Sequence, residues 1–131
     1  MLTIRNLIKS GALQLRNSQS AQLDSELLLC SILKLNREQL YCRLNDVTTN
    51  KQLSSFCELI KKRSIGTPVA YLLNQKEFRS LNFFVDQSVL VPRPETEILV
   101  ELALKESEIQ TGINILELGT GSGIISASIA K

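Results

Sequence analysis

The chain has 131 residues, 44% hydrophobic and 21% charged, a composition typical of a folded globular protein that excludes disordered and fibrous chains. It contains no histidine, which excludes histidine-dependent catalytic triads and most zinc sites. The formal net charge of +2 is unevenly spread, because residues 1–80 hold 12 basic and 6 acidic side chains whereas residues 81–131 hold 3 and 7.

Apolar residues recur at three- and four-residue spacings in two early segments, which predicts two amphipathic helices. The first carries Leu2, Ile4, Leu7, Ile8, Ala12 and Leu15, and the second, after a start at Ser20, carries Leu23, Leu27, Leu28, Ile32 and Leu33. A shorter helix over residues 36–44 follows, and Thr48 or Thr49 can cap a fourth helix that runs to about Ser64. Each helix would be marginal alone, so we expect the four to pack as a small bundle.

Gly66 and Pro68 interrupt the helical pattern, and residues 69–73 are expected to add one or two helical turns before the chain becomes extended. The segment beyond is rich in aromatic and β-branched residues. Its strand-forming positions are Phe78, Leu81, Phe83 and Val85, followed by Val89, Leu90 and Val91. With a turn near residues 86–88, this pattern predicts a β-hairpin.

Pro92 and Pro94 end the extended segment, and Pro94 is suited to the first position of a helix. Glu95 and Glu97 in the opening turn would favour the positive end of the helix dipole. Its expected buried stripe consists of Ile98, Leu99, Leu102 and Ala103. Residues 113–118 then predict a buried parallel strand, and a further helix is expected from Ser122 onwards.

Three isolated features bear on partners and compartment. Lys61, Lys62 and Arg63 form the one basic cluster, but no aromatic residue stands among them, which favours a solvated helix face over a nucleic-acid site. The cysteines, Cys30, Cys42 and Cys57, lack CxxC spacing, and we expect reduced thiols buried as small apolar side chains, with no metal. With no long apolar run and no signal-peptide pattern, the sequence predicts a cytoplasmic protein outside the membrane.

The most informative stretch is a predicted strand that leads through a glycine-rich turn into a helix. Gly119, Gly121 and Gly123 alternate with Thr120 and Ser122, and Glu117 stands two positions before the first glycine. Glycine permits positive φ and close approach of a ligand, so such a turn suits part of a nucleotide-like cofactor. The spacing is GxGxG and not the GxGxxG of dinucleotide-binding domains. A turn with glycines for packing only, and a nicotinamide or flavin site, remain as alternatives.

The acidic-x-G-x-G-x-G pattern resembles motif I of the S-adenosylmethionine methyltransferases, whose glycines pack against the methionine part of the cofactor. The preceding chain is similar to the release factor glutamine methyltransferase family in Arg63-x-x-Gly66-x-Pro68-x-x-Tyr71 and above all in VLVPRPETE, followed by ILELGTGSG. Together these motifs cover residues 63–130, and a helical bundle ahead of them also matches the family.

The resemblance implies an N-terminal α-helical bundle, a β-hairpin linker and the truncated start of an α/β, Rossmann-like methyltransferase domain. We expect residues 1–73 to bind a release factor, residues 74–92 to form the linker and residues 93–131 to begin the methyltransferase domain. The implied reaction is methylation, by S-adenosylmethionine, of the glutamine side-chain amide in the Gly-Gly-Gln motif of peptide chain release factors. Direct nucleic-acid binding is not expected.

The same resemblance assigns candidate site residues. The cofactor would contact Gly119, Thr120, Gly121, Ser122 and Gly123, and also Glu117, which replaces a commoner aspartate. Arg93, Glu95 and Thr96 are expected beside the cofactor and substrate pocket, with Arg93 as a candidate partner for a carboxylate. No catalytic residue and no metal ligand is assigned. Asn74 and Ser80 stand where the family usually has glycine; asparagine tolerates a left-handed backbone better than serine does.

The family's substrate motif, Asn-Pro-Pro-Tyr, does not occur in these 131 residues, nor does the acidic residue expected beyond the glycine turn for the cofactor's ribose. We therefore expect the chain alone to be inactive, as a truncated form of a longer enzyme. A strand over residues 113–118 would leave an apolar edge unless another copy covered it, so this part is expected to be unstable alone. The alternatives are a non-catalytic module that binds release factors and a related methyltransferase acting on another protein or a nucleic acid.

Overall fold

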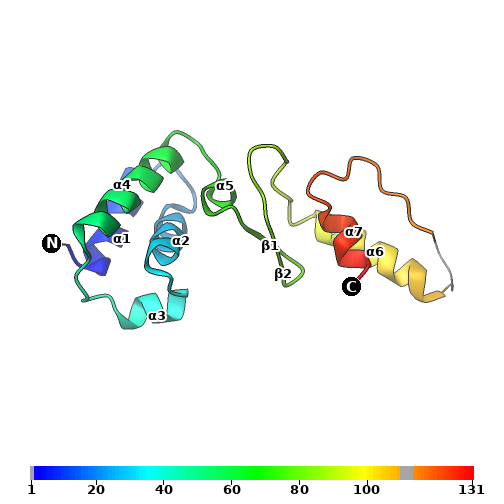
Figure 1. Cartoon of the computed structure of the whole chain (residues 1–131), viewed down its shortest axis with the longest axis horizontal. Helices are drawn as coiled ribbons and strands as arrows, with labels where there is room; N and C mark the ends of the chain where they lie inside the picture. Colours follow the sequence, from blue (N-terminus) through cyan, green and yellow to red (C-terminus); the bar gives the residue numbers. More distant parts are fainter. Residues whose placement is uncertain (1, 110–113) are drawn as a thin grey trace. The chain divides into compact units, whose positions relative to one another are not determined.

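The structure, a computed structural model, describes residues 2–109 and 114–131. The chain divides into two compact units, Met1–Leu73 and Asn74–Lys131, called unit 1 and unit 2 below. Figure 1 labels their helices and strands. The predicted N-terminal helical domain is confirmed by unit 1, whereas the only paired strands among the described residues form a small two-stranded sheet in unit 2.

Unit 1 contains the predicted bundle. Its helices are α1 (Ile4–Gln14), α2 (Ala21–Leu33), α3 (Arg37–Cys42), α4 (Asn50–Ser64) and the short α5 (Val69–Leu73). Side chains cap three of them: Thr3 accepts a hydrogen bond at the start of α1, and Asn36 and Thr49 form capping boxes with Gln39 and Gln52. Local sequence therefore sets where these helices begin.

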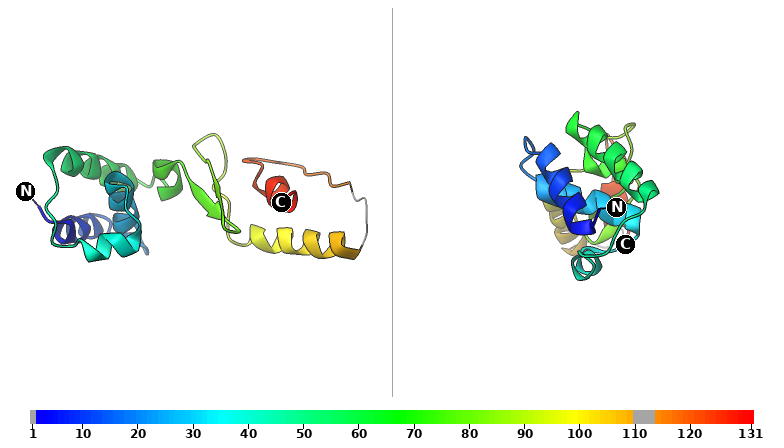
Figure 2. Two further views of the ribbon diagram at one scale, coloured as in Figure 1. Left: turned by 60° about the horizontal axis from the view of Figure 1, so that its bottom comes forward. Right: turned by 90° about the vertical axis from the view of Figure 1, so that its left-hand side faces the viewer.

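The core of unit 1 lies where α1, α2 and α4 pack together, and α5 contacts both α2 and α4 (Figures 1 and 2). Its buried apolar residues are Ile4, Leu7, Ile8, Leu15, Leu28, Leu29, Cys30, Leu40, Phe56 and Ile60. The helices approach closely at Gly11, where an added Cβ would lie 2.5 Å from Ser25 Oγ and 2.7 Å from Phe56 Cζ. Only glycine fits this position, because any side chain would overlap both neighbours.

The first residues of unit 1 are tied to the segment between α3 and α4. The backbone N–H groups of Ile4 and Arg5 donate to the carbonyls of Asp46 and Leu44, each at 3.0 Å. Both the N–H and the hydroxyl of the buried Thr48 donate to the Leu2 carbonyl, at 3.0 and 2.9 Å. These bonds satisfy backbone groups that would otherwise be left without partners.

Unit 2 begins with the antiparallel pair β1 (Lys76–Phe78) and β2 (Leu81–Phe83), in which Lys76 faces Phe83 and Phe78 faces Leu81. Arg79 and Ser80 form the connecting turn, with φ of 47° and 60°, and two consecutive left-handed residues are typical of a type I′ hairpin turn. Asn74 is left-handed as well, with φ of 51°. The two positions where glycine is usual in the resembling family thus both require positive φ.

The predicted hairpin was misplaced along the chain. Its turn was expected near residues 86–88, with residues 89–91 as the second strand, but the sheet lies wholly before residue 84. A local turn does occur there, because Asp86 accepts hydrogen bonds from the backbone and hydroxyl of Ser88. Residues 89–91 are not a strand, and Leu90 is 75% exposed. The pattern of β-branched residues correctly indicated extended backbone, but it did not indicate which segments pair as strands.

Helix α6 (Thr96–Ile109) starts two residues after Pro94, following turns in which Thr96 and Glu97 donate to the carbonyls of Arg93 and Pro94. The predicted buried stripe was wrong, because Ile98, Leu99 and Leu102 are each more than half exposed. Among the side chains of α6 that the structure describes, the buried one is instead Val100, which packs with Phe78 of β1 and Ile124 of α7 (Ile124–Ile129). A two-stranded sheet and a six-residue helix can cover only one narrow face of α6.

The predicted parallel strand does not form in the part of it that the structure describes. Ile113 lies outside the described residues, and residues 114–118 are irregular, with Leu116 and Leu118 at 85% and 86% exposure. A parallel strand needs neighbouring strands for its backbone hydrogen bonds, and among the described residues no strand pairs with residues 114–118. Within the described ranges, no helix is both long and apolar enough to cross a bilayer.

Candidate functional site

The glycine-rich turn of unit 2 lies between the irregular residues 114–118 and α7. Gly119, Gly121 and Gly123 all have positive φ, at 73°, 55° and 72°, so each adopts a conformation that other residues rarely take. A Cβ added at Gly119 or Gly123 would meet nothing within 4 Å. The backbone at these two glycines therefore has open space beside it, and the cofactor contact stays a prediction.

Glu117 precedes this turn and forms hydrogen bonds with a residue that follows it, Ser126. Its carboxylate accepts hydrogen bonds from the backbone N–H of Ser126, at 3.1 Å, and from the Ser126 hydroxyl. The Gly123 N–H donates to the Thr120 carbonyl at 2.8 Å and closes the turn on the other side. Glu117 thus acts here as a support for the start of α7, a role that its place in the motif did not reveal.

The predicted pocket-side residues lie where the chain turns into α6. Arg93 and Glu95 are exposed and Thr96 is half-buried, and the carbonyls of Arg93 and Glu95 accept hydrogen bonds within the turn itself. The neighbouring Glu97, expected only to favour the helix dipole, accepts a hydrogen bond from the Arg79 N–H at 3.3 Å. Glu97 therefore joins the hairpin turn to α6. Among the residues that the structure describes, no hydrogen bond or ion pair connects Arg93, Glu95 or Thr96 to the glycine turn.

Unit 1 contains a buried carboxylate that the sequence analysis did not single out. Asp24 of α2 is 5% exposed, and its Oδ2 receives the Arg63 Nε–H at 2.8 Å. The hydroxyls of Ser18 and Ser20 also donate to Asp24, at 3.2 and 2.9 Å. Arg63 was predicted to belong to a solvated basic face, but its side chain is only 21% exposed and turns inward. A buried charge needs such a partner because desolvation is costly.

A second buried carboxylate lies two residues further along α2. Glu26 is 1% exposed and accepts hydrogen bonds from Tyr41, Gln22 and Arg37, at 2.5, 2.8 and 2.7 Å. Burial by itself would raise the pKa of Glu26, but the hydrogen bonds from these three side chains and the charge of Arg37 outweigh it and hold the pKa below its usual value. The sequence did contain a signal for buried, paired carboxylates, because Asp24 and Glu26 stand within the largely apolar run AQLDSELLLC.

The lowered pKa of Glu26 predicts a pH dependence of stability. A carboxyl whose pKa is lower when folded stabilises the protein above its unfolded pKa, and that contribution is lost as pH falls through the folded value. We expect Glu26→Gln to lower the free energy of unfolding by about 2 kcal/mol at pH 7. The difference from wild type should shrink as the pH falls below about 4.3, the usual pKa of an unfolded glutamate, and should vanish once the pH has also fallen through the lower folded pKa of Glu26.

Urea unfolding monitored by tyrosine fluorescence at several pH values would measure this effect. The chain has two tyrosines and no tryptophan, and Tyr41 and Tyr71 both lie in unit 1. Glu58→Gln is the matched control, because Glu58 forms an exposed ion pair with Lys62 at 2.7 Å and should have a much smaller effect. A Glu26→Gln deficit that stayed constant from pH 7 to 3 would contradict the assignment.

The cysteines differ from the prediction in part. All three are free, but only Cys30 is buried, and Cys42 and Cys57 are exposed. Burial is the main reason that the pKa of the Cys30 thiol is raised, and the nearby charge of Glu26 adds to this effect. Across the residues that the structure describes, no three His, Cys, Asp or Glu side chains are grouped so that they could hold a metal ion.

Comparison with known proteins relates both units to one group. Residues 6–73 match the family model described as the PrmC N-terminal domain. A release factor glutamine methyltransferase of Coxiella burnetii is 42% identical over 131 residues, 99% of this chain and 47% of the relative. Those of Shewanella oneidensis and Bacillus cereus are 40% and 39% identical over 88% and 80% of this chain, and 40% and 38% of their own lengths. The chain thus spans less than half the length of these relatives.

Proposed function

The chain belongs to the PrmC N-terminal domain family, and on that premise we propose that it serves a methyltransferase that modifies peptide chain release factors. The proposed reaction transfers a methyl group from S-adenosylmethionine to the side-chain amide of the glutamine in the Gly-Gly-Gln motif. The observation that carries the proposal is the 42% identity to a release factor glutamine methyltransferase over 131 residues, which includes both the bundle and the glycine turn. We propose the cytoplasm as its compartment.

The two units would have different tasks. Unit 1, the part that matches the family model, would bind the release factor. Residues 74–92 would link it to residues 93–131, the start of a Rossmann-like domain. In that domain Gly119, Thr120, Gly121, Ser122 and Gly123 would contact the cofactor, with Arg93, Glu95 and Thr96 beside the pocket.

The residues of the glycine turn fit this cofactor role. Three glycines with positive φ and open surroundings let a ligand approach the backbone. Glu117 contributes by supporting the turn, since its carboxylate is held by Ser126. When bound, S-adenosylmethionine would supply an electrophilic methyl group. As part of a whole enzyme, the residues of this chain would help to bind the two substrates and to orient them, which accounts for a large part of the rate in such transfers.

The alternative is that the 131 residues of this chain act only as a binding module for release factors. One observation favours it. Leu116 and Leu118 are almost fully exposed, so the segment leading into the glycine turn is not held in a sheet. A cofactor site that must first be ordered binds weakly, because ordering reduces the affinity. We therefore propose that this chain alone binds a release factor and transfers no methyl group.

Calorimetric titration of the complete chain tests this proposal. We expect saturable binding of a purified release factor, and no measurable heat with S-adenosylmethionine because the turn lacks a supporting sheet. Mass spectrometry of the release factor after incubation with both should show no added methyl group, whereas the Coxiella burnetii relative serves as the positive control for transfer.

Each part of the proposal can fail separately. Failure to bind any release factor would contradict the docking role of unit 1. Methylation by the chain alone would contradict its proposed inactivity. If S-adenosylmethionine does bind, the glycine turn needs no supporting sheet, and Gly121→Val should then abolish binding because valine cannot adopt a φ of 55° without strain.

A further inference from the structure

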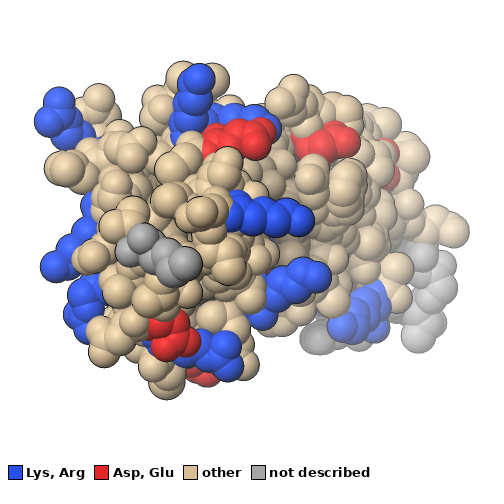
Figure 3. Space-filling view, turned by 60° about the vertical axis from the view of Figure 1, so that its left-hand side comes forward, with Lys and Arg blue, Asp and Glu red and all other residues tan. Residues whose placement is uncertain are grey.

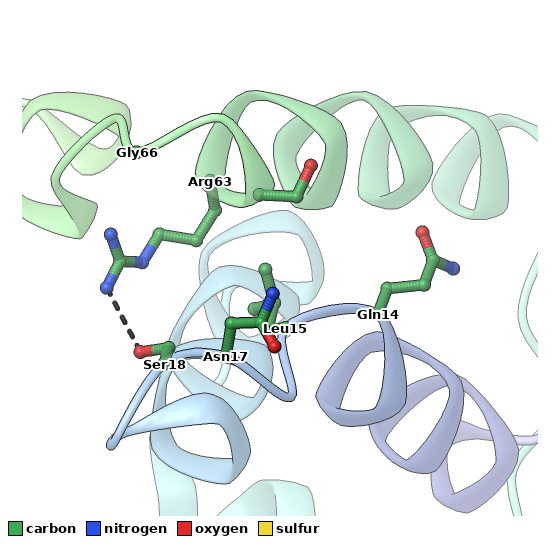
Figure 4. A pocket seen from close by; sticks show the side chains of 7 residues that line it. Gln14, Leu15, Asn17, Ser18, Arg63 and Gly66 are labelled. Carbon is green, nitrogen blue, oxygen red and sulfur yellow. Dashed lines mark hydrogen bonds between the residues drawn. The ribbon is translucent and has the colours of Figure 1, made fainter.

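A polar pocket of about 250 Å³ opens in unit 1 where the end of α1 faces the end of α4. Its lining residues are Gln14, Leu15, Asn17, Ser18, Arg63, Ser64 and Gly66, most of which Figure 4 labels. We propose that this pocket receives an acidic side chain from the release factor and thereby docks it to the bundle. This inference rests on the proposed function, because the release factor is its partner.

Arg63 lines the pocket, and three hydrogen bonds hold its guanidinium in place. Arg63 donates from Nε to Asp24 Oδ2 at 2.8 Å, from Nη2 to Ser18 Oγ at 3.2 Å and from Nη1 to the Thr67 carbonyl at 3.3 Å. Figure 4 shows Arg63 extending from α4 toward Ser18. Arginine has five N–H donors, so one on Nη1 and one on Nη2 are left for an acceptor from outside the described chain. Such a fork is suited to a carboxylate.

The rim adds neutral donors. Gln14 and Asn17, which Figure 4 labels, are exposed and carry side-chain amides. Amide groups can donate to a carboxylate or to the peptide groups beside it. No aromatic residue lines the pocket, and a site for single-stranded nucleic acid would use such rings to stack bases.

The charges beside the pocket favour an acidic partner. Arg16 stands between two lining residues, and Lys61 and Lys62 precede Arg63 directly. Lys62 is paired with Glu58, but Arg16 and Lys61 make no ion pair within the part of the chain that the structure describes. Figure 3 shows Lys and Arg side chains spread over much of the face in view. Such a surface attracts acidic groups.

Isothermal titration of the complete chain with a purified release factor tests the pocket. Asn17→Asp places a negative charge at its rim, and the dissociation constant is expected to rise by at least about fivefold through repulsion of the incoming carboxylate. Asn17→Lys should lower the constant. Asn6→Asp, the same change at an exposed position on α1 that does not line the pocket, is the matched control and should remain within about twofold of wild type.

Two further measurements separate the outcomes. Raising the salt from about 50 to about 300 mM should weaken wild-type binding and reduce the difference between Asn17→Asp and wild type. Amide NMR signals of residues 14–18 and 63–66 should shift on addition of the release factor. If Asn17→Asp and wild type bound the release factor equally well, the proposed role of the pocket would be overturned, while the docking role of unit 1 would stand. No binding by wild type would overturn the proposed function and this inference together.

Discussion

Gly11→Val is expected to destabilise unit 1 by about 3 kcal/mol, at the upper end of what overpacking a core costs. The Cβ alone would lie 2.5 Å from Ser25 Oγ, 2.7 Å from Phe56 Cζ and 3.0 Å from Ile60 Cδ1. Ser25 cannot easily move away, because its hydroxyl donates to the Ile8 carbonyl at 2.9 Å. The better helix propensity of valine offsets only a few tenths of a kcal/mol.

Urea unfolding with tyrosine fluorescence measures this loss, since both tyrosines lie in unit 1. Ser10→Val introduces the same side chain at the adjacent, exposed position of α1 and should change the free energy of unfolding by less than about 0.5 kcal/mol. If the two variants were equally stable, α1 could not approach α2 and α4 as closely as the structure shows.

Arg63→Leu should destabilise unit 1 by about 3 kcal/mol, because it leaves the carboxylate of Asp24 buried without a counter-charge. The hydroxyls of Ser18 and Ser20 would still donate to Asp24, but they carry no charge. In the double variant Asp24→Asn, Arg63→Leu the buried charge is gone, and stability should recover by more than about 1 kcal/mol relative to Arg63→Leu.

The same denaturation experiment on wild type, both single variants and the double variant completes a thermodynamic cycle for this pair. Lys61→Leu is the control, since Lys61 is an exposed neighbour of Arg63 on α4 without an ion pair in the described chain. Additive effects of the two single substitutions would show that Asp24 and Arg63 do not stabilise each other.

Much of unit 1 could be predicted from sequence because its signals are local. The apolar spacing of Ile4, Leu7 and Ile8 identified the inner face of α1, and all three are buried. The helix start predicted at residue 36 is confirmed by the Asn36 cap, and of the two predicted caps, Thr48 and Thr49, the structure uses Thr49. Such signals involve residues within one or two helical turns of each other, so they can be recognised without knowing which helices pack together.

The polar contacts of unit 1 could not be predicted in the same way. Arg63 and Asp24 are 39 residues apart in sequence, and neither spacing nor charge indicated that they meet. Arg63 was predicted on a solvated face because two lysines precede it. In a helix, however, each successive residue is rotated by about 100°, so adjacent side chains point in different directions. The pocket formed by the ends of α1 and α4 depends on this inward turn.

In unit 2, sequence identified the kinds of elements but not all of their partners. It determined the glycine turn and the start of α6 near Pro94, since both depend on local backbone preferences. Tertiary structure decided that Phe78 pairs with Leu81, that Val100 of α6 is buried whereas Ile98 is exposed, and that residues 114–118 form no strand. Strand pairing and burial depend on which surfaces meet, and such contacts between distant residues leave no period in the sequence.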